Sequence, residues 1–153
     1  MTATAPHFPT LPDPDTEGEF YADVPFKRLL AWIVDVILIG IVSVVLVPFT
    51  LFTALFYFPL LFMTVGFLYR VVGLARLSAT PGMWLTAIQI RDRDGARLDL
   101  TGALLHTAGY TLSVMMFPLQ LVSIALMLLT PRRQGLTDLV LGTAAINRPT
   151  ETL

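Results

Sequence analysis

A stretch of 41 residues, Leu29–Tyr69, carries a single charged side chain, Asp35, and constrains the fold more than any other feature. A bilayer core about 30 Å thick is crossed by a helix of about 20 apolar residues, so this stretch is too long for one crossing and fits two. Pro48 lies near its middle, where the missing amide hydrogen and the clash of the ring favour a break. We therefore predict membrane helices over about 26–47 and 51–75, with a kink at Pro59 in the second.

A second apolar block, residues 100–131, contains no formal charge. As one straight helix it would be about 48 Å long, which exceeds one crossing and falls short of two full ones. Phe117-Pro118 divides it into helices over about 101–116 and 118–130. With 55% hydrophobic and 14% charged residues against roughly 25% charged in soluble domains, the chain is expected to be an all-α integral membrane protein.

The basic residues predict the orientation, because they concentrate on the cytoplasmic side of membrane proteins. The basic residues lie before and after the two apolar blocks, and the turn at 47–50 within the first block has none. Placing them all in the cytoplasm puts both termini there and favours four crossings over three. The residues are Lys27, Arg28, Arg70, Arg76, Arg91, Arg93, Arg97, Arg132 and Arg133.

A polar insert separates the two blocks. In Thr80-Pro81-Gly82, the threonine suits a helix N-cap and the proline suits the first helical position. Ile88-Gln89-Ile90 then alternates apolar and polar side chains before Asp94-Gly95, a typical hairpin turn. We predict a small cytoplasmic β-hairpin over about 86–98.

The two ends of the chain are expected to lie outside the membrane domain. Residues 1–23 contain five acidic side chains, several prolines and no lysine or arginine, a composition typical of a disordered tail. The membrane domain is expected over 24–147, followed by a short C-terminal tail over 148–153.

Asp35 is the most informative polar residue, because an aspartate at the centre of a membrane helix costs about 2.5–3.5 kcal/mol on insertion scales. Such residues face the bundle interior and have a partner or a task. One interpretation is that Arg28, Arg70 or Arg132 neutralises Asp35 and fixes helix packing. A second is that Asp35 binds a proton or a cation. A third is a neutral, protonated Asp35 held by hydrogen bonds.

The segment Arg132-Arg133-Gln134-Gly135-Leu136-Thr137-Asp138 closes the second block. Gly135 suits a helix C-cap, and the arginines suit the negative end of that helix. Thr137 and Asp138 suit the start of a new short helix. One interpretation is a capped helix end, and another is that Asp138 reaches Arg28 and forms a polar cluster, to which Asp35 could belong.

Several classes of function lack their usual residues. The chain contains no cysteine and two histidines, of which His106 lies on an apolar segment and is expected to be hydrogen-bonded. We therefore expect no metal site and no cofactor. The bases do not form a nucleic-acid footprint, and no nucleophile or phosphate-binding motif indicates an enzyme.

The segment Phe26–Asp35 resembles the opening motif of the RDD family of membrane proteins, which is named for one arginine and two aspartates. The resemblance continues through Thr80-Pro81-Gly82 and the predicted hairpin, and covers about 24–147. It implies a triad of Arg28, Asp35 and Asp138. Supporting motif residues are Thr80, Pro81, Gly82, Arg132, Arg133, Gly142 and Thr143.

Three positions depart from the pattern of that family. Met83 replaces a residue that is often basic, His106 an arginine, and Thr137 a histidine. These changes remove polar groups from the cytoplasmic face and weaken any mechanism that needs a dense charge relay.

The resemblance implies a multi-pass protein of the bacterial inner membrane, with the lipid bilayer as its surroundings. Some members of the family are associated with sodium/proton exchange, and others look like accessory proteins. The shortage of polar groups in the apolar blocks favours an accessory or interaction module that forms a homo-oligomer or joins a larger membrane complex. The alternative is a monovalent cation/proton exchanger in which Asp35 binds Na⁺ or H⁺ in turn.

Overall fold

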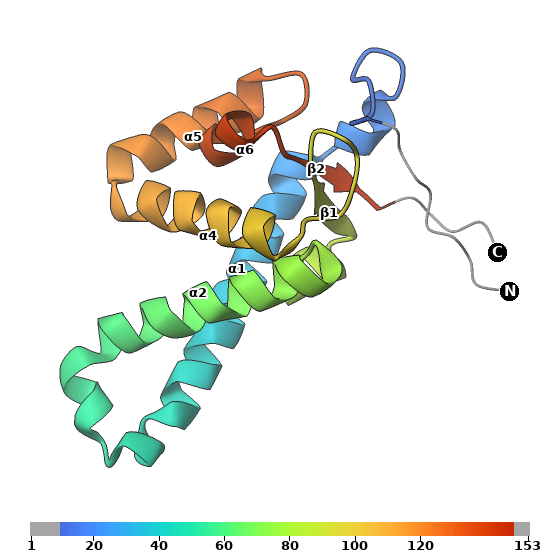
Figure 1. Ribbon diagram of the computed structural model, residues 1–153. Helices are drawn as coiled ribbons and strands as arrows, with labels where there is room; N and C mark the ends of the chain where they lie inside the picture. The colour runs from blue at the N-terminus through green and yellow to red at the C-terminus, as the bar shows by residue number, and fades with distance from the viewer. Residues whose placement is uncertain (1–9, 149–153) are drawn as a thin grey trace, which may run out of the picture.

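The computed structural model describes residues 10–148, and its helices form one long hairpin with a second group of helices packed beside it (Figure 1). The hairpin consists of α1 (Val24–Leu46) and α2 (Phe58–Leu77). The second group consists of α4 (Leu100–Met115), α5 (Phe117–Leu129) and α6 (Leu136–Leu141). At one end lie the short helix α3 (Pro81–Leu85) and the strands β1 (Ile88–Arg91) and β2 (Ala144–Asn147).

Prolines set the ends of the first two helices. α1 ends at Leu46, and Pro48 begins the 3-10 helix η2 (Pro48–Thr50), which is followed by η3 (Thr53–Tyr57). α2 therefore begins at Phe58, seven residues later than predicted. The predicted kink at Pro59 is wrong, because Pro59 lies in the first turn of α2, where an amide hydrogen has no helical partner to lose.

The second apolar block divides where predicted, between Met115 and Phe117. α4 and α5 are bent by 116° at this break. Within residues 10–148, two helical segments are long and apolar enough to cross a membrane, Gly18–Thr50 and Thr53–Leu77, and the bent pair would make a third if it forms one span. The four crossings that we predicted remain a prediction.

The predicted hairpin over 86–98 is wrong, although its turn is present. Asp92 accepts hydrogen bonds from the amides of Asp94 and Ala96, and only a single bridge joins Arg91 to Arg97. The chain then leaves β1, because Leu98 is buried and donates its amide hydrogen to Ser78. β1 pairs instead with β2, antiparallel, with Ile88 opposite Asn147 and Arg91 opposite Ala144.

Residues 10–23 lie against this sheet, which differs from the disordered tail predicted for 1–23. Leu11 and Tyr21 are buried with Ala144 and Ile146 of β2, next to the 3-10 helix η1 (Gly18–Tyr21). The Tyr21 hydroxyl donates to the carbonyl of Pro12 at 2.8 Å. A few well-placed apolar side chains thus order an acidic, proline-rich segment. Residues 1–9 and 149–153 lie outside the described residues.

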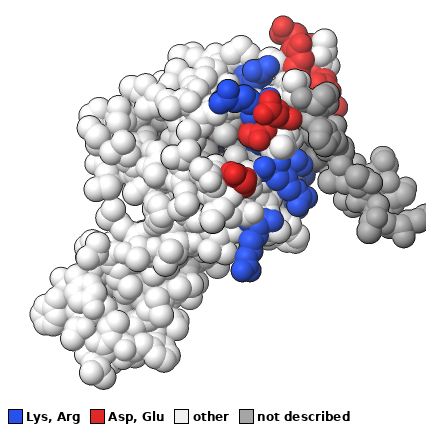
Figure 2. Space-filling view, in the orientation of Figure 1, with Lys and Arg blue, Asp and Glu red and all other residues white. Residues whose placement is uncertain are grey.

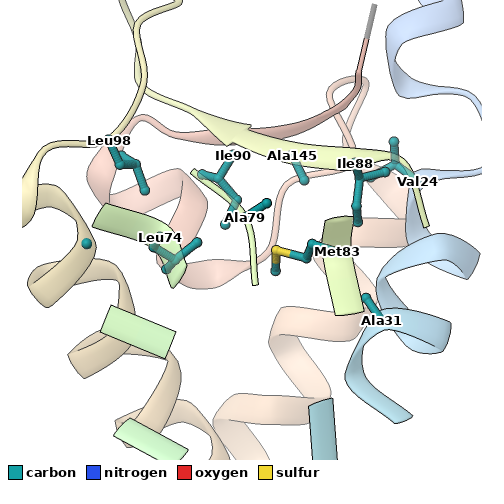
Figure 3. Packing of buried hydrophobic residues seen from close by; sticks show 10 residues of the cluster. Val24, Ala31, Leu74, Ala79, Met83, Ile88, Ile90, Leu98 and Ala145 are labelled. Carbon is teal, nitrogen blue, oxygen red and sulfur yellow. The ribbon is translucent and has the colours of Figure 1, made fainter. Parts of the chain in front are cut away.

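The hydrophobic core lies beneath the sheet, where α1, α2 and α3 meet (Figure 3). Ile88 and Ile90 of β1 and Leu74 of α2 are fully buried there. Away from this end, α1, α2, α4 and α5 expose large apolar side chains along their lengths. Figure 2 shows charged side chains gathered toward the end that carries the sheet, whereas the far end of the α1–α2 hairpin is white in this view. This distribution is that of a protein surrounded by lipid over most of its length.

Candidate functional site

Asp35 lies on α1, is 1% exposed and joins three segments of the chain. Its Oδ1 accepts hydrogen bonds from the Tyr69 hydroxyl at 2.7 Å and the Gly82 amide at 2.9 Å. Its Oδ2 accepts from the Thr80 hydroxyl at 2.6 Å and lies 3.9 Å from Nη2 of Arg70. Of the three arginines predicted as partners, Arg70 is the one that pairs with Asp35. Three donors thus hydrogen-bond to the carboxylate, and the Arg70 guanidinium faces it as an ion pair.

The predicted helix start at Thr80-Pro81-Gly82 supplies two of these donors. Thr80 is the N-cap of α3, and its hydroxyl accepts from the Met83 amide at 3.2 Å while donating to Asp35. Gly82 allows α3 to approach α1 closely, because a Cβ there would overlap the carbonyl oxygen of Ala31 and lie 2.6 Å from Asp35 Oδ1. The motif therefore places two hydrogen-bond donors at the carboxylate of Asp35.

Asp138, on α6, forms a second buried network and is 0% exposed. Its Oδ2 lies 2.5 Å from Nη1 of Arg28 and accepts from the Gly135 amide at 3.0 Å. Its Oδ1 accepts from the Thr143 hydroxyl at 3.0 Å and lies 2.9 Å from Nε2 of His106. The predicted contact between Arg28 and Asp138 is present, and it joins the start of α1 to α6.

The electrostatics of Asp138 favour its ionised form. Burial raises the pKa of this carboxyl, but the Arg28 guanidinium and the hydrogen bond and charge of His106 outweigh burial and hold the pKa well below its usual range. Because an ionised carboxylate only accepts hydrogen bonds, His106 Nε2 carries the hydrogen. His106, predicted to be hydrogen-bonded, therefore donates a hydrogen bond to Asp138.

This shift predicts acid sensitivity. The pKa of Asp138 is lower in the folded protein than the value of about 3.9 of an unfolded chain, so its stabilising contribution is complete above about pH 5 and is lost as the pH falls below 4. The free energy of unfolding in detergent should then fall by up to about 1.4 kcal/mol per pH unit for this group. Denaturation at pH 3–7 measures it. Asp138→Asn should show a shallower decline, and parallel curves for the two proteins would contradict the assignment.

The two carboxylates lie in separate networks and do not form the single cluster considered from the sequence. Arg28 contacts Asp138 and not Asp35. Arg70 instead extends the Asp35 network, because its guanidinium lies 3.8 Å from the ring centre of Tyr110. The Tyr110 hydroxyl in turn accepts from Trp32 Nε1 at 2.9 Å, which links α2 and α4 back to α1.

Gly142, Arg133 and Arg132 have their contacts outside the two networks. Gly142 ends α6 in a left-handed conformation with φ of 71°. Arg133 donates to the carbonyl of Leu128 at 2.6 Å, and Arg132 interacts with Tyr21 rather than with Asp35. Gly135 begins α6 and does not cap α5, which corrects its predicted place. A Cβ at Gly135 would lie 2.7 Å from Ser123 Oγ, so this close contact requires glycine.

Sequence reasoning did not identify Tyr69 and Tyr110 as members of the Asp35 network. Tyr69 follows Asp35 by 34 positions on another helix, and no local spacing relates the two. The available signal was the adjacent Arg70, the first charged residue after Asp35 in the chain.

A cavity of about 730 Å³ opens between α1 and the α4–α6 group. Both carboxylates line it, together with Arg28, Arg70 and His106. Among residues 10–148 no group of three or more histidine, aspartate and glutamate side chains could hold a metal ion.

The comparisons with known proteins identify one family. The sequence model of the RDD family matches residues 23–142, a range that includes both buried carboxylates and Arg28. No curated protein and no solved structure matches the chain.

Proposed function

This chain belongs to the RDD family of membrane proteins, and on that basis we propose that it is an accessory or interaction module of the membrane. In this proposal the triad of Arg28, Asp35 and Asp138 fixes the arrangement of the helices at one end. The exposed apolar helices then contact a second copy of the chain or a larger membrane complex.

The observation that carries the proposal is the burial of both carboxylates among partners from this chain. Each oxygen of Asp35 and of Asp138 has two partners, and both side chains are 1% exposed. A carboxylate that exchanges ions has to release its partners each time an ion enters or leaves. Side chains held in this way are suited to holding helices together.

The partner surface proposed here is the outward face of α1. The small residues of the hairpin are used inside the chain: Gly40 lies against Phe62 and Gly66 against Ile39. The free apolar side chains on α1, each about half exposed, are Ile37, Ile41, Val44 and Val45. Their surface is suited to packing against another membrane helix.

A photo-crosslinking experiment tests this assignment. A photoreactive amino acid at Ile41, at native expression, should give a discrete protein adduct. The matched control is Leu112 on α4, which is also 56% exposed and should give no protein adduct. Equal labelling from the two positions, or none from Ile41, would contradict an α1 interface.

The alternative function, exchange of a monovalent cation for a proton at Asp35, draws support from one observation, that Asp35 lines the cavity. Inverted vesicles from a host without exchangers separate the two functions. The accessory module predicts no proton movement when Na⁺, Li⁺ or K⁺ is added to vesicles with well-inserted wild-type protein. Cation-driven flux that disappears in Asp35→Asn at equal expression would instead establish the exchanger.

The proposal also includes a location, the bacterial inner membrane with the sheet end in the cytoplasm. Its support is that the Lys and Arg residues gather at that end (Figure 2), as the positive-inside rule requires. A reporter protein that is active only in the cytoplasm should be active when it is fused after Leu153. A reporter that is active only outside the cytoplasm should be inactive at the same position.

A further inference from the structure

The pair of helices α4 and α5 starts and finishes at the same end of the molecule. Leu98, just before α4, is buried in the core beneath the sheet. Arg132, three residues after the end of α5, interacts with Tyr21, which packs against β2. The strands β1 and β2, which precede and follow the two helices, are paired with one another. The pair therefore enters and leaves a membrane on the side of the sheet, which excludes a single crossing.

Both helices are too short to reach the opposite surface of a bilayer. At 1.5 Å per residue, the 16 residues of α4 extend about 24 Å and the 13 residues of α5 about 20 Å. The hydrocarbon core is about 30 Å thick, and any tilt shortens the reach of a helix further. By contrast, the 23 residues of α1 extend about 34 Å, which is enough to cross. In Figure 1 the α1–α2 hairpin accordingly extends farther from the sheet than the turn between α4 and α5 does.

The surface of this turn is apolar. Residues 114–119 are all apolar, and residues 100–131 contain no formal charge. At the turn itself, Met115, Met116 and Phe117 are 66%, 50% and 70% exposed. The nearest polar side chains contact each other, because the Ser113 hydroxyl donates to Oε1 of Gln120 at 3.0 Å. Such a surface is stabilised by contact with acyl chains and not by contact with water.

The backbone at the turn is also suited to hydrocarbon, where no water is present to satisfy a free polar group. Met116 is the one residue between the two helices. Its amide donates to the Leu112 carbonyl at 3.1 Å, and its carbonyl accepts from the amides of Leu119 at 2.9 Å and Gln120 at 3.2 Å. Pro118, in the first turn of α5, has no amide hydrogen that needs an acceptor.

We propose that α4 and α5 form a re-entrant hairpin, which enters the bilayer from the side of the sheet and ends among the acyl chains. The chain then crosses the membrane twice, through α1 and α2, and not four times as expected from the sequence. The turn at Met115–Phe117 contacts hydrocarbon and neither aqueous phase. This inference requires the sheet end to lie at one membrane surface, but it needs neither an α1 partner nor an exchange activity.

Labelling of single cysteines tests the position of the turn, because the chain has no cysteine of its own. Phe117→Cys places a thiol at the turn. Phe49→Cys, the same change at an 80% exposed phenylalanine of the α1–α2 tip, is the matched control. Asp94→Cys, in an exposed loop beside β1, reports the side of the sheet. A membrane-impermeant maleimide is added to spheroplasts and to inverted vesicles of the expression host, and labelling after denaturation in SDS gives the total thiol.

We expect Asp94→Cys to react from one side of the membrane only and Phe49→Cys from the other side only. Phe117→Cys should react at least about tenfold more slowly than either from both sides, because the reactive thiolate forms in water. Fast reaction of Phe117→Cys from the Phe49 side means that α4 and α5 cross, and fast reaction from the Asp94 side means that they lie outside the bilayer. Either result overturns the proposal. If Phe49→Cys does not react from the side opposite to Asp94→Cys, α1 and α2 do not cross, and the proposal is also wrong.

A nitroxide attached to Phe117→Cys distinguishes lipid from a covering protein. With the full chain in phospholipid vesicles, collisions of the nitroxide with oxygen should be frequent and collisions with a water-soluble nickel chelate rare. If both kinds of collision are rare, a protein surface covers the turn and the proposal is overturned. Met116→Cys, at a residue that is 50% exposed, repeats both measurements in case one variant folds poorly, and circular dichroism verifies the helical content of each protein.

Discussion

Asp138→Ala is expected to lower the free energy of unfolding by about 3–5 kcal/mol, the usual effect of removing one partner of a buried ion pair. The change leaves the Arg28 guanidinium without its carboxylate at the start of α1, where its side chain is 16% exposed. It also removes the acceptor of His106 and Thr143, both of which are buried. The stabilisation lost is therefore that of a network that joins α1, α4 and α6.

Denaturation in detergent micelles measures this loss, and Asp99→Ala is the matched control. Asp99 accepts a hydrogen bond from the Gly102 amide as the N-cap of α4, but it is exposed, so its replacement should cost only about 1 kcal/mol. The double variant Arg28→Met with Asp138→Ala should lose less than the sum of the single changes, because no unpaired charge remains. Equal losses for Asp138→Ala and Asp99→Ala would contradict the role assigned to Asp138.

Asp35→Ala is expected to cost a similar amount, about 3–5 kcal/mol, for a different reason. Three donors lose their acceptor at once: the hydroxyls of Tyr69 and Thr80 and the amide of Gly82. Arg70 loses its counter-charge. Because these donors come from α2 and from the start of α3, the loss should loosen the attachment of α3 to α1.

Hydrogen exchange over residues 80–86 provides a local readout beside global stability. Exchange of the Gly82 and Met83 amides should become faster in Asp35→Ala. The matched control is Ser43→Ala on the same helix. Ser43 is also fully buried but donates only to the Ile39 carbonyl of its own helix, so about 1 kcal/mol is expected. If the α3 amides stay equally protected from hydrogen exchange in Asp35→Ala, the proposed attachment of α3 to α1 through Asp35 is contradicted.

Local chemistry was sufficient to predict much of this fold. The missing amide of proline predicted the end of α1 near Pro48 and the break between α4 and α5, both within a residue or two. The capping preference of threonine predicted the start of α3 at Thr80-Pro81. The free-energy cost of a charge in an apolar segment singled out Asp35, the family resemblance singled out Asp138, and both side chains are buried.

Long-range contacts could not be predicted in the same way. The sequence of β2, Ala-Ala-Ile-Asn, has no strand alternation of its own, and it becomes a strand because β1 lies beside it, more than 50 residues earlier in the chain. The hydrogen bond from Tyr69 to Asp35 depends on how α2 is rotated about its axis against α1. Such rotations are decided by packing of whole helices, which no short motif encodes.

The partners within each network lie far apart in the sequence, so the two networks can form at different times during synthesis of the chain. Asp35 receives its donors from residues synthesised 34 to 47 positions later, whereas Arg28 waits 110 positions for Asp138. The contacts of Asp35 with α2 and α3 can therefore form while the remainder of the chain is still being made. The ion pair between Arg28 and Asp138 forms last. A nascent chain interrupted before α6 would therefore leave the Arg28 guanidinium without its carboxylate.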